Sequence, residues 1–235
     1  MNLDRTNHIF VEHLEAPKVF VIPVGSVENH GVHLPVTTDT IITNALVEEL
    51  ARQRPDSVVV GPTIPYSVSL EARNVAGTFA ITEELMANTL RSLTKCLPQG
   101  MNAIAVSAHG ENLNALIEAR IPFWIPRMHV LMDAANRWEL PETAVGMWSP
   151  DFHAGRTETS MLLAIAPEAV NAPDSSSHNG NTRSPTILLN EAASTDLALE
   201  QNEFPLGANQ EEGLAIMAAF TDDLVCSFDE FFRNR

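Results

Sequence analysis

Basic residues are scarce in this chain. Its 14 Lys and Arg residues stand against 30 Asp and Glu residues, which leaves a formal net charge of -16 at pH 7. A surface of that sign repels the phosphate backbone of nucleic acids and an anionic membrane surface. We therefore expect neither a nucleic-acid partner nor a membrane partner. The surplus carboxylates suit a solvated surface, or a ligand that is neutral or cationic.

Cysteine and long apolar runs are scarce as well. The two cysteines, Cys96 and Cys226, lie far apart and form no CxxC pair. This spacing argues against a disulfide framework and against a cysteine-based zinc site. No stretch approaches the roughly 20 apolar residues that span a bilayer, and the residues after Met1 lack the apolar run of a signal peptide. The expected location is the reducing environment of the cytoplasm.

Apolar residues are abundant, at 45% of 235 residues, so the chain can bury a sizeable core. We expect a single domain over residues 1–235. Short apolar runs alternate with segments of helical periodicity, a pattern that predicts an α/β fold with a mostly parallel sheet. The expected strands are 18–25, 57–60, 103–107 and 129–132, and the expected helices are 39–50, 83–97, 112–120, 159–165 and 211–232. The segment 172–205, rich in Ser, Asn, Thr and Pro, is expected to be irregular or to contact a partner.

The first polar cluster follows the strand predicted at 18–25. The sequence there is GSVENHGVHLP, and Asp39 comes a few residues later. Residues two apart in extended backbone point to the same side, so Glu28 and His30 can reach one centre. The loop can bring Asp39 back to them.

The second cluster follows the strand predicted at 103–107 and has the same spacing, His109-Gly110-Glu111. Ligands of parallel sheets gather at the carboxyl ends of the strands, so the two clusters are expected to meet. Each residue alone has an ordinary interpretation, such as a solvated carboxylate, a hydrogen-bonded structural histidine or a helix cap at Asp39.

Taken together, the two clusters predict a site for two divalent cations. Their four positive charges would be cancelled by the carboxylates of Glu28, Asp39 and Glu111 together with one bridging hydroxide, which suits a partly buried pocket. Imidazole and carboxylate ligands without thiolate favour zinc, manganese or iron. Asp39 is the candidate bridge between cations about 3.5–4 Å apart.

A third cluster, HAGRTETS, occupies residues 153–160. His153 is expected in a loop and Glu158 at the beginning of a helix, so both could face the same cleft. Alternatively, Glu158 is a carboxylate stabilised by the helix dipole and Arg156 is a surface charge.

These motifs, in this order, resemble those of the creatininase, or creatinine amidohydrolase, family. The resemblance rests on residues 23–35 with Asp39, on GTFAI at 77–81, on AHGEN at 108–112 and on residues 153–160. It implies a three-layer α/β/α sandwich, a binuclear metal centre and hydrolysis of carbon–nitrogen bonds other than ordinary peptide bonds. It also implies a homo-oligomer, often a hexamer, and a strand at 77–81.

The resemblance divides five ligands between the two cations. Carried over by position, it implies that Glu28 and His109 bind one cation and that His30 and Glu111 bind the other. Asp39 is then the bridge, in agreement with the spacing and charge argument above.

The resemblance also implies a catalytic histidine at His153, and it places Glu158 in the site without a firm role. Many members have Gly where Glu111 stands, and in those the acid corresponding to Glu158 is the candidate for the missing carboxylate. Here both acids are present, as in creatininase itself.

The expected reaction is attack of a metal-bridging hydroxide on a small cyclic amide, such as a creatinine-like lactam, while His153 delivers a proton to the departing nitrogen. The loop 66–73 lacks the Tyr-Gly pair and the following histidine of many members, and Asn29 replaces the usual Gln, so creatinine itself is not implied. The alternatives are a formamide deformylase, a processing hydrolase for a redox-cofactor peptide, a hydrolase of cyclic ketones, and a metal- or ligand-binding protein without catalysis.

Overall fold

Four parallel strands form the centre of the fold. The computed structural model describes residues 18–127, 153–171, 204–205 and 207–234. In these residues one sheet has the strand order β2-β1-β3-β4, and every pairing is parallel. The strands are β1 (Val19–Val24), β2 (Val58–Val60), β3 (Asn102–Ser107) and β4 (Phe123–Trp124). The helices are α2 (Thr38–Gln53), α3 (Glu83–Thr94), α4 (Leu113–Ala119), α6 (Arg156–Ile165) and α8 (Gln210–Arg233), with short 3-10 turns η2 (Gly110–Asn112) and η4 (Pro167–Ala169).

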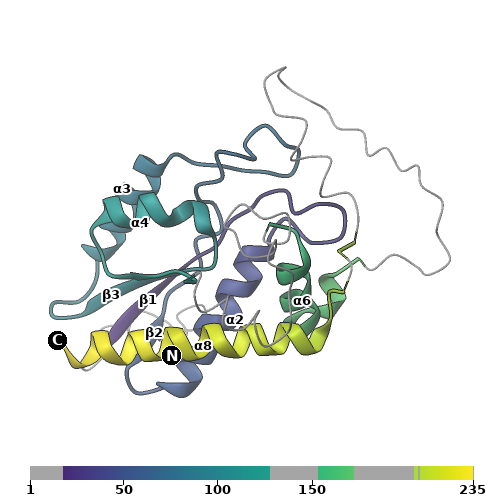
Figure 1. Cartoon of the computed structure of the whole chain (residues 1–235). Coiled ribbons are helices and arrows are strands. Elements are labelled where there is room, and N and C mark those ends of the chain that lie inside the picture. The colour runs from purple at the N-terminus through teal and green to yellow at the C-terminus, as the bar shows by residue number, and fades with distance from the viewer. Residues whose placement is uncertain (1–17, 128–152, 172–203, 206, 235) are drawn as a thin grey trace, which may run out of the picture.

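Helices cover both faces of this sheet, as Figure 1 shows, with α3 and α4 on one side and α2, α6 and α8 on the other. The side chains of β1 alternate accordingly, since successive residues of a strand point to opposite faces. Val19 and Val21 pack with α2 and α8, whereas Ile22 and Val24 pack with α3 and α4. The predicted three-layer α/β/α sandwich is confirmed.

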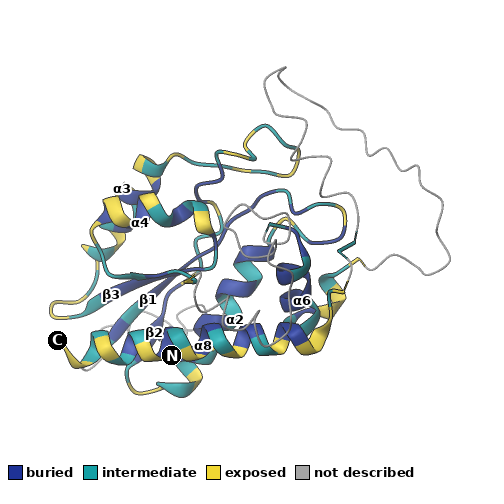
Figure 2. Cartoon of the chain, in the orientation of Figure 1, coloured by how far each residue is buried: buried dark blue, intermediate teal, exposed yellow. Residues whose placement is uncertain are grey.

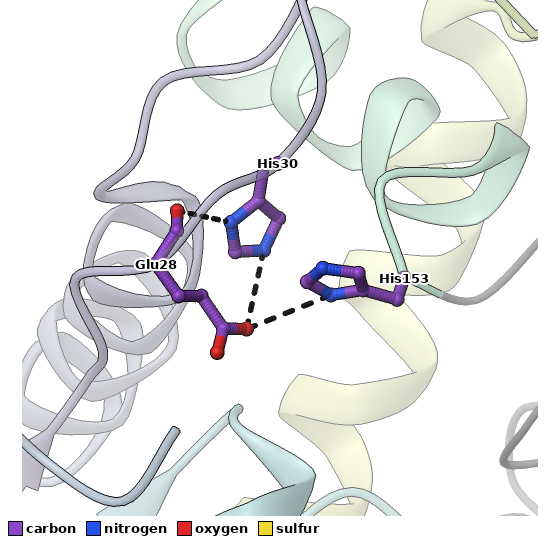
Figure 3. Close-up of side chains that lie close together, drawn as sticks. All are labelled: Glu28, His30 and His153. Carbon is purple, nitrogen blue, oxygen red and sulfur yellow. Dashed lines mark hydrogen bonds and ion pairs between the residues drawn. The ribbon is translucent and has the colours of Figure 1, made fainter. Parts of the chain in front are cut away.

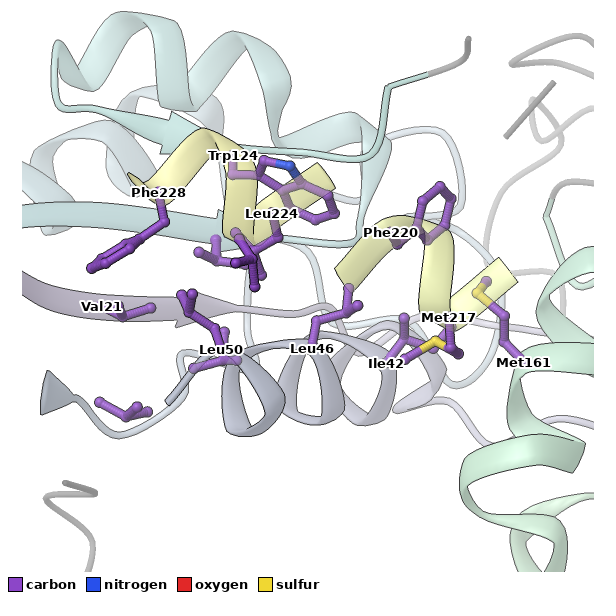
Figure 4. Close-up of a cluster of buried hydrophobic side chains, with 14 of the residues drawn as sticks. Val21, Ile42, Leu46, Leu50, Trp124, Met161, Met217, Phe220, Leu224 and Phe228 are labelled. Carbon is purple, nitrogen blue, oxygen red and sulfur yellow. The ribbon is translucent and has the colours of Figure 1, made fainter. Parts of the chain in front are cut away.

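The larger core lies between the sheet, α2 and α8 (Figure 4). Leu46 and Leu50 of α2 are fully buried there together with Phe220 and Leu224 of α8. Figure 2 shows the buried side of α8 turned inward and its exposed side turned to solvent, the arrangement expected for an amphipathic helix.

A close contact fixes α8 against α6. A Cβ atom added at Gly213 would lie 1.8 Å from the carbonyl oxygen of Ser160, so only glycine permits this approach. The contact brings the N-terminal half of α8 onto the helix that carries Glu158.

The predicted elements agree with the structure except at a few positions. The strands at 18–25, 57–60 and 103–107 are confirmed, and the one at 129–132 lies outside the described residues, as does 172–203. Residues 77–81 form a loop rather than the expected strand. The two-residue β4 was not predicted, because a pair of residues carries no periodicity. No described helix is long and apolar enough to cross a bilayer, and the single domain and the homo-oligomer stay predictions.

Candidate metal centre

The loop after β1 passes unusually close to the beginning of α2. A Cβ atom at Gly25 would lie 2.1 Å from Thr40 Oγ1, so the sequence needs glycine here. Next to it, Ser26 Oγ donates to Asp39 Oδ2 at 2.6 Å. The interpretation of Asp39 as a helix cap is wrong, because the N-cap is Thr37 and Asp39 lies in the first turn. Its carboxylate is directed towards the loop instead.

Asp39 belongs to a first group of possible ligands with Glu28 and His109. Nδ1 of His109 lies 3.0 Å from Asp39 Oδ2 and 3.4 Å from Glu28 Oε1. All three side chains are buried. They come from the loop after β1, from α2 and from the loop after β3, and β1 and β3 are neighbours in the sheet. The expected meeting of the first two clusters is therefore observed.

Asp39 also belongs to a second group, with His30 and Glu158. Nε2 of His30 lies 3.6 Å from Asp39 Oδ2 and 3.6 Å from Glu158 Oε2. Glu158 Oε2 in addition accepts a hydrogen bond from the Ala154 backbone at 2.6 Å, which fixes its position. Since Asp39 Oδ2 faces the imidazoles of both groups, Asp39 has the placement of a bridge.

His153 lies at the open side of this cluster. Its Nδ1 is 3.5 Å from Glu28 Oε1, and its ring centre is 4.6 Å from that of His30 (Figure 3). The side chain is 33% exposed, whereas His30 and His109 are buried. His153 is thus the imidazole of the cluster that solvent and a ligand can reach.

Glu111 does not join the cluster. Its Oε2 accepts a hydrogen bond from the Leu70 backbone at 2.7 Å, and no group of possible cation ligands among the described residues includes it. The structure thus places Glu111 apart from these groups, and its assignment to the second cation stays a prediction. The 3-10 turn after His109 directs Glu111 towards the loop at 66–70, and Glu158 lies beside His30 instead.

Each of the three histidines directs one ring nitrogen at a backbone carbonyl. The pairs are His30 Nδ1 with Glu28 O (3.1 Å), His109 Nε2 with Val68 O (2.6 Å) and His153 Nε2 with Asn29 O (3.0 Å). A carbonyl only accepts, so the nitrogen facing it carries hydrogen, and the other nitrogen of each neutral ring presents a lone pair to the carboxylates. Histidines that bind metals are commonly oriented in this way.

The second nitrogen of His30 gives the sharpest test of whether a cation fits. Nε2 is buried and has no hydrogen-bond partner, although oxygens of Glu28, Asp39 and Glu158 lie 3.6–3.9 Å away. A lone pair surrounded by carboxylate oxygens is unfavourable unless a proton or a metal cation lies between them. The donor set of imidazole and carboxylate without thiolate fits a divalent cation such as zinc or manganese.

The same charges shift the pKa values of the imidazoles. Burial would lower the pKa of His30, but Glu158, Asp39 and Glu28 raise it to about 10. Burial likewise opposes charge on His109, yet Asp39 and Glu28 raise its pKa to about 10. The cluster therefore attracts positive charge strongly.

The other titrating groups respond in different directions. Burial raises the pKa of Glu28 to about 7, although the positive charge of His109 opposes the shift. The pKa of Asp39 is lowered despite its burial, because His109, His30 and Ser26 stabilise the carboxylate. Burial is the main cause that lowers the pKa of His153, so this ring is neutral at pH 7.

Two buried polar residues that sequence reasoning missed hold the loops together. Asn112 donates to Gly25 O at 3.2 Å and accepts from the Val68 backbone at 3.2 Å, which joins the loop after β1 to the loop before Ser69. Ser69 Oγ donates to the Val68 backbone carbonyl at 2.8 Å and lies 3.5 Å from His109 Nε2. Asn112 stands within the AHGEN motif, whereas nothing in the sequence distinguishes Ser69 from other serines.

Comparison with known proteins matches this chain to one family along nearly its whole length. The family model described as creatininase, creatinine amidohydrolase, covers residues 4–227. The chain belongs to the creatininase family. This result confirms the family predicted from the motifs.

Relatives within the family include two mycobacterial proteins. The mycofactocin precursor peptide peptidase of Mycolicibacterium smegmatis is 34% identical over 174 residues, which cover 67% of this chain and 62% of that protein. The protein of the same name from Mycobacterium tuberculosis is 32% identical over 221 residues, 87% of this chain and 82% of that one. The chain thus spans less than two thirds of the first relative and most of the second.

Solved creatininase structures share the fold at lower identity. One crystal structure of a creatinine amidohydrolase matches with a TM-score of 0.76 at 18% identity and covers 98% of this chain and 97% of its own. A manganese form of a creatininase matches with a TM-score of 0.73 at 17% identity, with 98% of each chain covered. Identities this low establish the fold and leave the substrate open.

Proposed function

We propose that this chain is a hydrolase that uses two divalent cations to cleave an amide carbon–nitrogen bond. The observation that carries the proposal is the buried, unpartnered Nε2 of His30 facing three carboxylates. One cation would be held by Glu28, Asp39 and His109, and the other by His30, Asp39 and Glu158. Asp39 would bridge them, as in the earlier prediction, whereas Glu158 replaces Glu111.

Bound cations would supply a nucleophile at neutral pH from water and would polarise the amide carbonyl. The protein balances their charge incompletely. The carboxylates of Glu28, Asp39 and Glu158 offset three of four positive charges, which leaves one positive charge at the centre. This remaining positive charge stabilises an anionic nucleophile and the negative charge that develops on the carbonyl oxygen.

His153 is the proposed proton carrier. The Asn29 carbonyl holds its Nε2–H, so Nδ1 is the nitrogen available to the reaction. Because burial lowers its pKa, the ring begins neutral and can take a proton from the attacking water. It then returns that proton to the departing nitrogen, which an amide requires because its leaving group is poor.

The proposed substrate is an amide bond in a peptide related to cofactor production. The sequence alone favoured a creatinine-like lactam and kept a cofactor peptide as an alternative. The relatives at 32–34% identity are named precursor peptide peptidases, whereas the creatininase structures are 17–18% identical. Greater similarity to the peptidases supports the peptide alternative, as does the divergent loop at 66–73.

Hydrolysis by metal-loaded protein tests this function. Protein stripped with a chelator and reloaded with zinc or manganese is incubated with short peptides, creatinine, small lactams and formamides, and the products are identified by mass spectrometry. We expect peptide cleavage that disappears with the chelator and returns with metal. Binding of metal without hydrolysis of any compound would instead support a metal-binding protein that lacks catalysis.

A further inference from the structure

A third buried histidine, His33, lies next to the candidate metal centre without belonging to it. His33 is 1% exposed, and no group of possible cation ligands in the described residues contains it. It follows His30 by three positions, in the loop that also carries Glu28. The catalytic scheme above gives this imidazole no task, although a buried polar ring needs hydrogen-bond partners to offset its desolvation.

The contact that His33 makes joins two distant parts of the chain. Its Nε2 lies 2.9 Å from Oγ1 of Thr159, at a separation of 126 positions in the sequence. Thr159 is fully buried in α6 and directly follows Glu158. One hydrogen bond therefore connects the loop that supplies His30 to the helix turn that supplies Glu158.

Two further contacts hold His33, one through its backbone and one through its ring. Its backbone carbonyl accepts a hydrogen bond from the Asn171 backbone at 2.8 Å. Its ring meets the edge of Phe204 with the ring centres 5.6 Å apart. The loop thus presents a fixed hydrogen-bonding atom to α6, and a fixed atom can determine where the helix turn lies.

We propose that His33 is a positioning residue that, through Thr159, holds Glu158 within reach of His30 and Asp39. The inference rests on the proposed function, because it concerns the second of the two cation positions. Without the hydrogen bond, the turn of α6 can shift relative to the loop, and the carboxylate of Glu158 is held less firmly at the second position. The first position, built from Glu28, Asp39 and His109, does not include α6 and is unaffected.

Stepwise zinc titration against a chromophoric chelator tests the proposal with His33→Leu and Thr159→Val. Each substitution removes one partner of the bond, and threonine and valine are nearly equal in shape. We expect the second zinc equivalent to bind about 10–100-fold more weakly, the usual cost of losing a group that orients a metal ligand. The first equivalent should keep its affinity. The double variant should be no weaker than either single variant, because both remove the same bond.

Matched controls separate positioning from general damage. His33→Gln can place a hydrogen-bonding atom near the position of Nε2, and Thr159→Ser keeps the hydroxyl, so both should recover most of the second affinity. The thermal midpoint of the metal-free protein is measured for every variant. If His33→Leu does not fold, the second zinc affinity is compared between Thr159→Val, which removes the hydroxyl, and Thr159→Ser, which keeps it.

The results of the zinc titration distinguish failure of the positioning role of His33 from failure of the proposed two-cation function. Wild-type protein that binds fewer than two zinc equivalents overturns the two-cation function and the inference with it. Wild-type protein that binds two, with variants that bind both equally well or lose both alike, overturns only the positioning role. A lowered thermal midpoint with unchanged zinc affinities assigns His33 to folding alone.

Discussion

Binding of zinc to the metal-free protein should release protons, and the structure indicates how many. His30 and His109 both have a pKa raised to about 10, so both imidazoles are protonated at pH 7 before a cation arrives. A metal ligand must be deprotonated, so each ring must give up its proton. We therefore expect the two imidazoles to release about two protons when both positions fill at neutral pH.

The pH dependence of affinity follows from that count. Each displaced proton changes the apparent affinity about tenfold per pH unit, so between pH 7 and 9 each zinc affinity should rise about tenfold per unit and the product of the two about 100-fold. Glu28, with a pKa of about 7, is partly protonated at neutrality and adds a further proton below pH 7. The slope should therefore steepen on the acidic side and level off near pH 10.

Calorimetric titration in buffers of different ionisation enthalpy counts the released protons directly. His109→Gln is the matched control, because it removes one titrating imidazole and should lower the count by about one. Release of less than about half a proton by the wild-type protein at pH 7 would show that the imidazoles are neutral. The electrostatic reasoning about the centre would then be wrong.

Stability of the metal-free protein should change with pH in the opposite direction and fall as the pH rises. A histidine whose pKa is raised by folding stabilises most below its ordinary pKa of 6.5 and loses that contribution as pH rises through about 10. Glu28, whose pKa is also raised, contributes most below 4.5 and loses that contribution through about 7. The thermal midpoint should fall from pH 7 to 10 without metal and should fall less with zinc present. A midpoint that rises over this interval would contradict these pKa shifts.

The remaining predictions concern single substitutions. Asp39→Ala should lose both cations and all turnover, and elemental analysis that still finds two cations would exclude a bridging role. His153→Ala should keep the metal but slow hydrolysis about 10²–10⁴-fold, the usual worth of one acid–base group, so an unchanged kcat would remove it from the reaction. Glu158→Gln should abolish the second zinc equivalent while Glu111→Gln leaves both, and the reverse result in a zinc titration would restore Glu111 as the ligand. Gly213→Ala should lower the free energy of unfolding by about 1–3 kcal/mol through overpacking, which urea denaturation measures; an unchanged value would show that α8 can shift.

Much of the fold of this protein follows from short-range patterns in its sequence. The apolar runs at 18–25 and 103–107 are strands because a continuous apolar segment suits a sheet covered on both faces. The carboxyl ends of such parallel strands lie at one edge, so polar residues placed just after them can meet. That rule alone predicted the encounter of Glu28 with His109, which the structure shows at 3.4 Å.

The choice between Glu158 and Glu111 lay beyond any local pattern. Both acids stand in recognisable motifs, and the spacing of Glu111 from His109 matches that of Glu28 and His30. The 3-10 turn after His109 sends one carboxylate to the Leu70 backbone, and the packing of α6 against α2 and α8 brings the other beside His30. Contacts between elements far apart in the chain determine where each carboxylate lies.

Residue types and their order were thus enough to identify the family, the layers and the kind of chemistry, because these depend on periodicity and on which groups follow which strands. Which nitrogen of each histidine faces the carboxylates, which acid completes the second group and what His33 touches depended on packing. Those features arise from backbone carbonyls and helix faces that only the folded chain brings together.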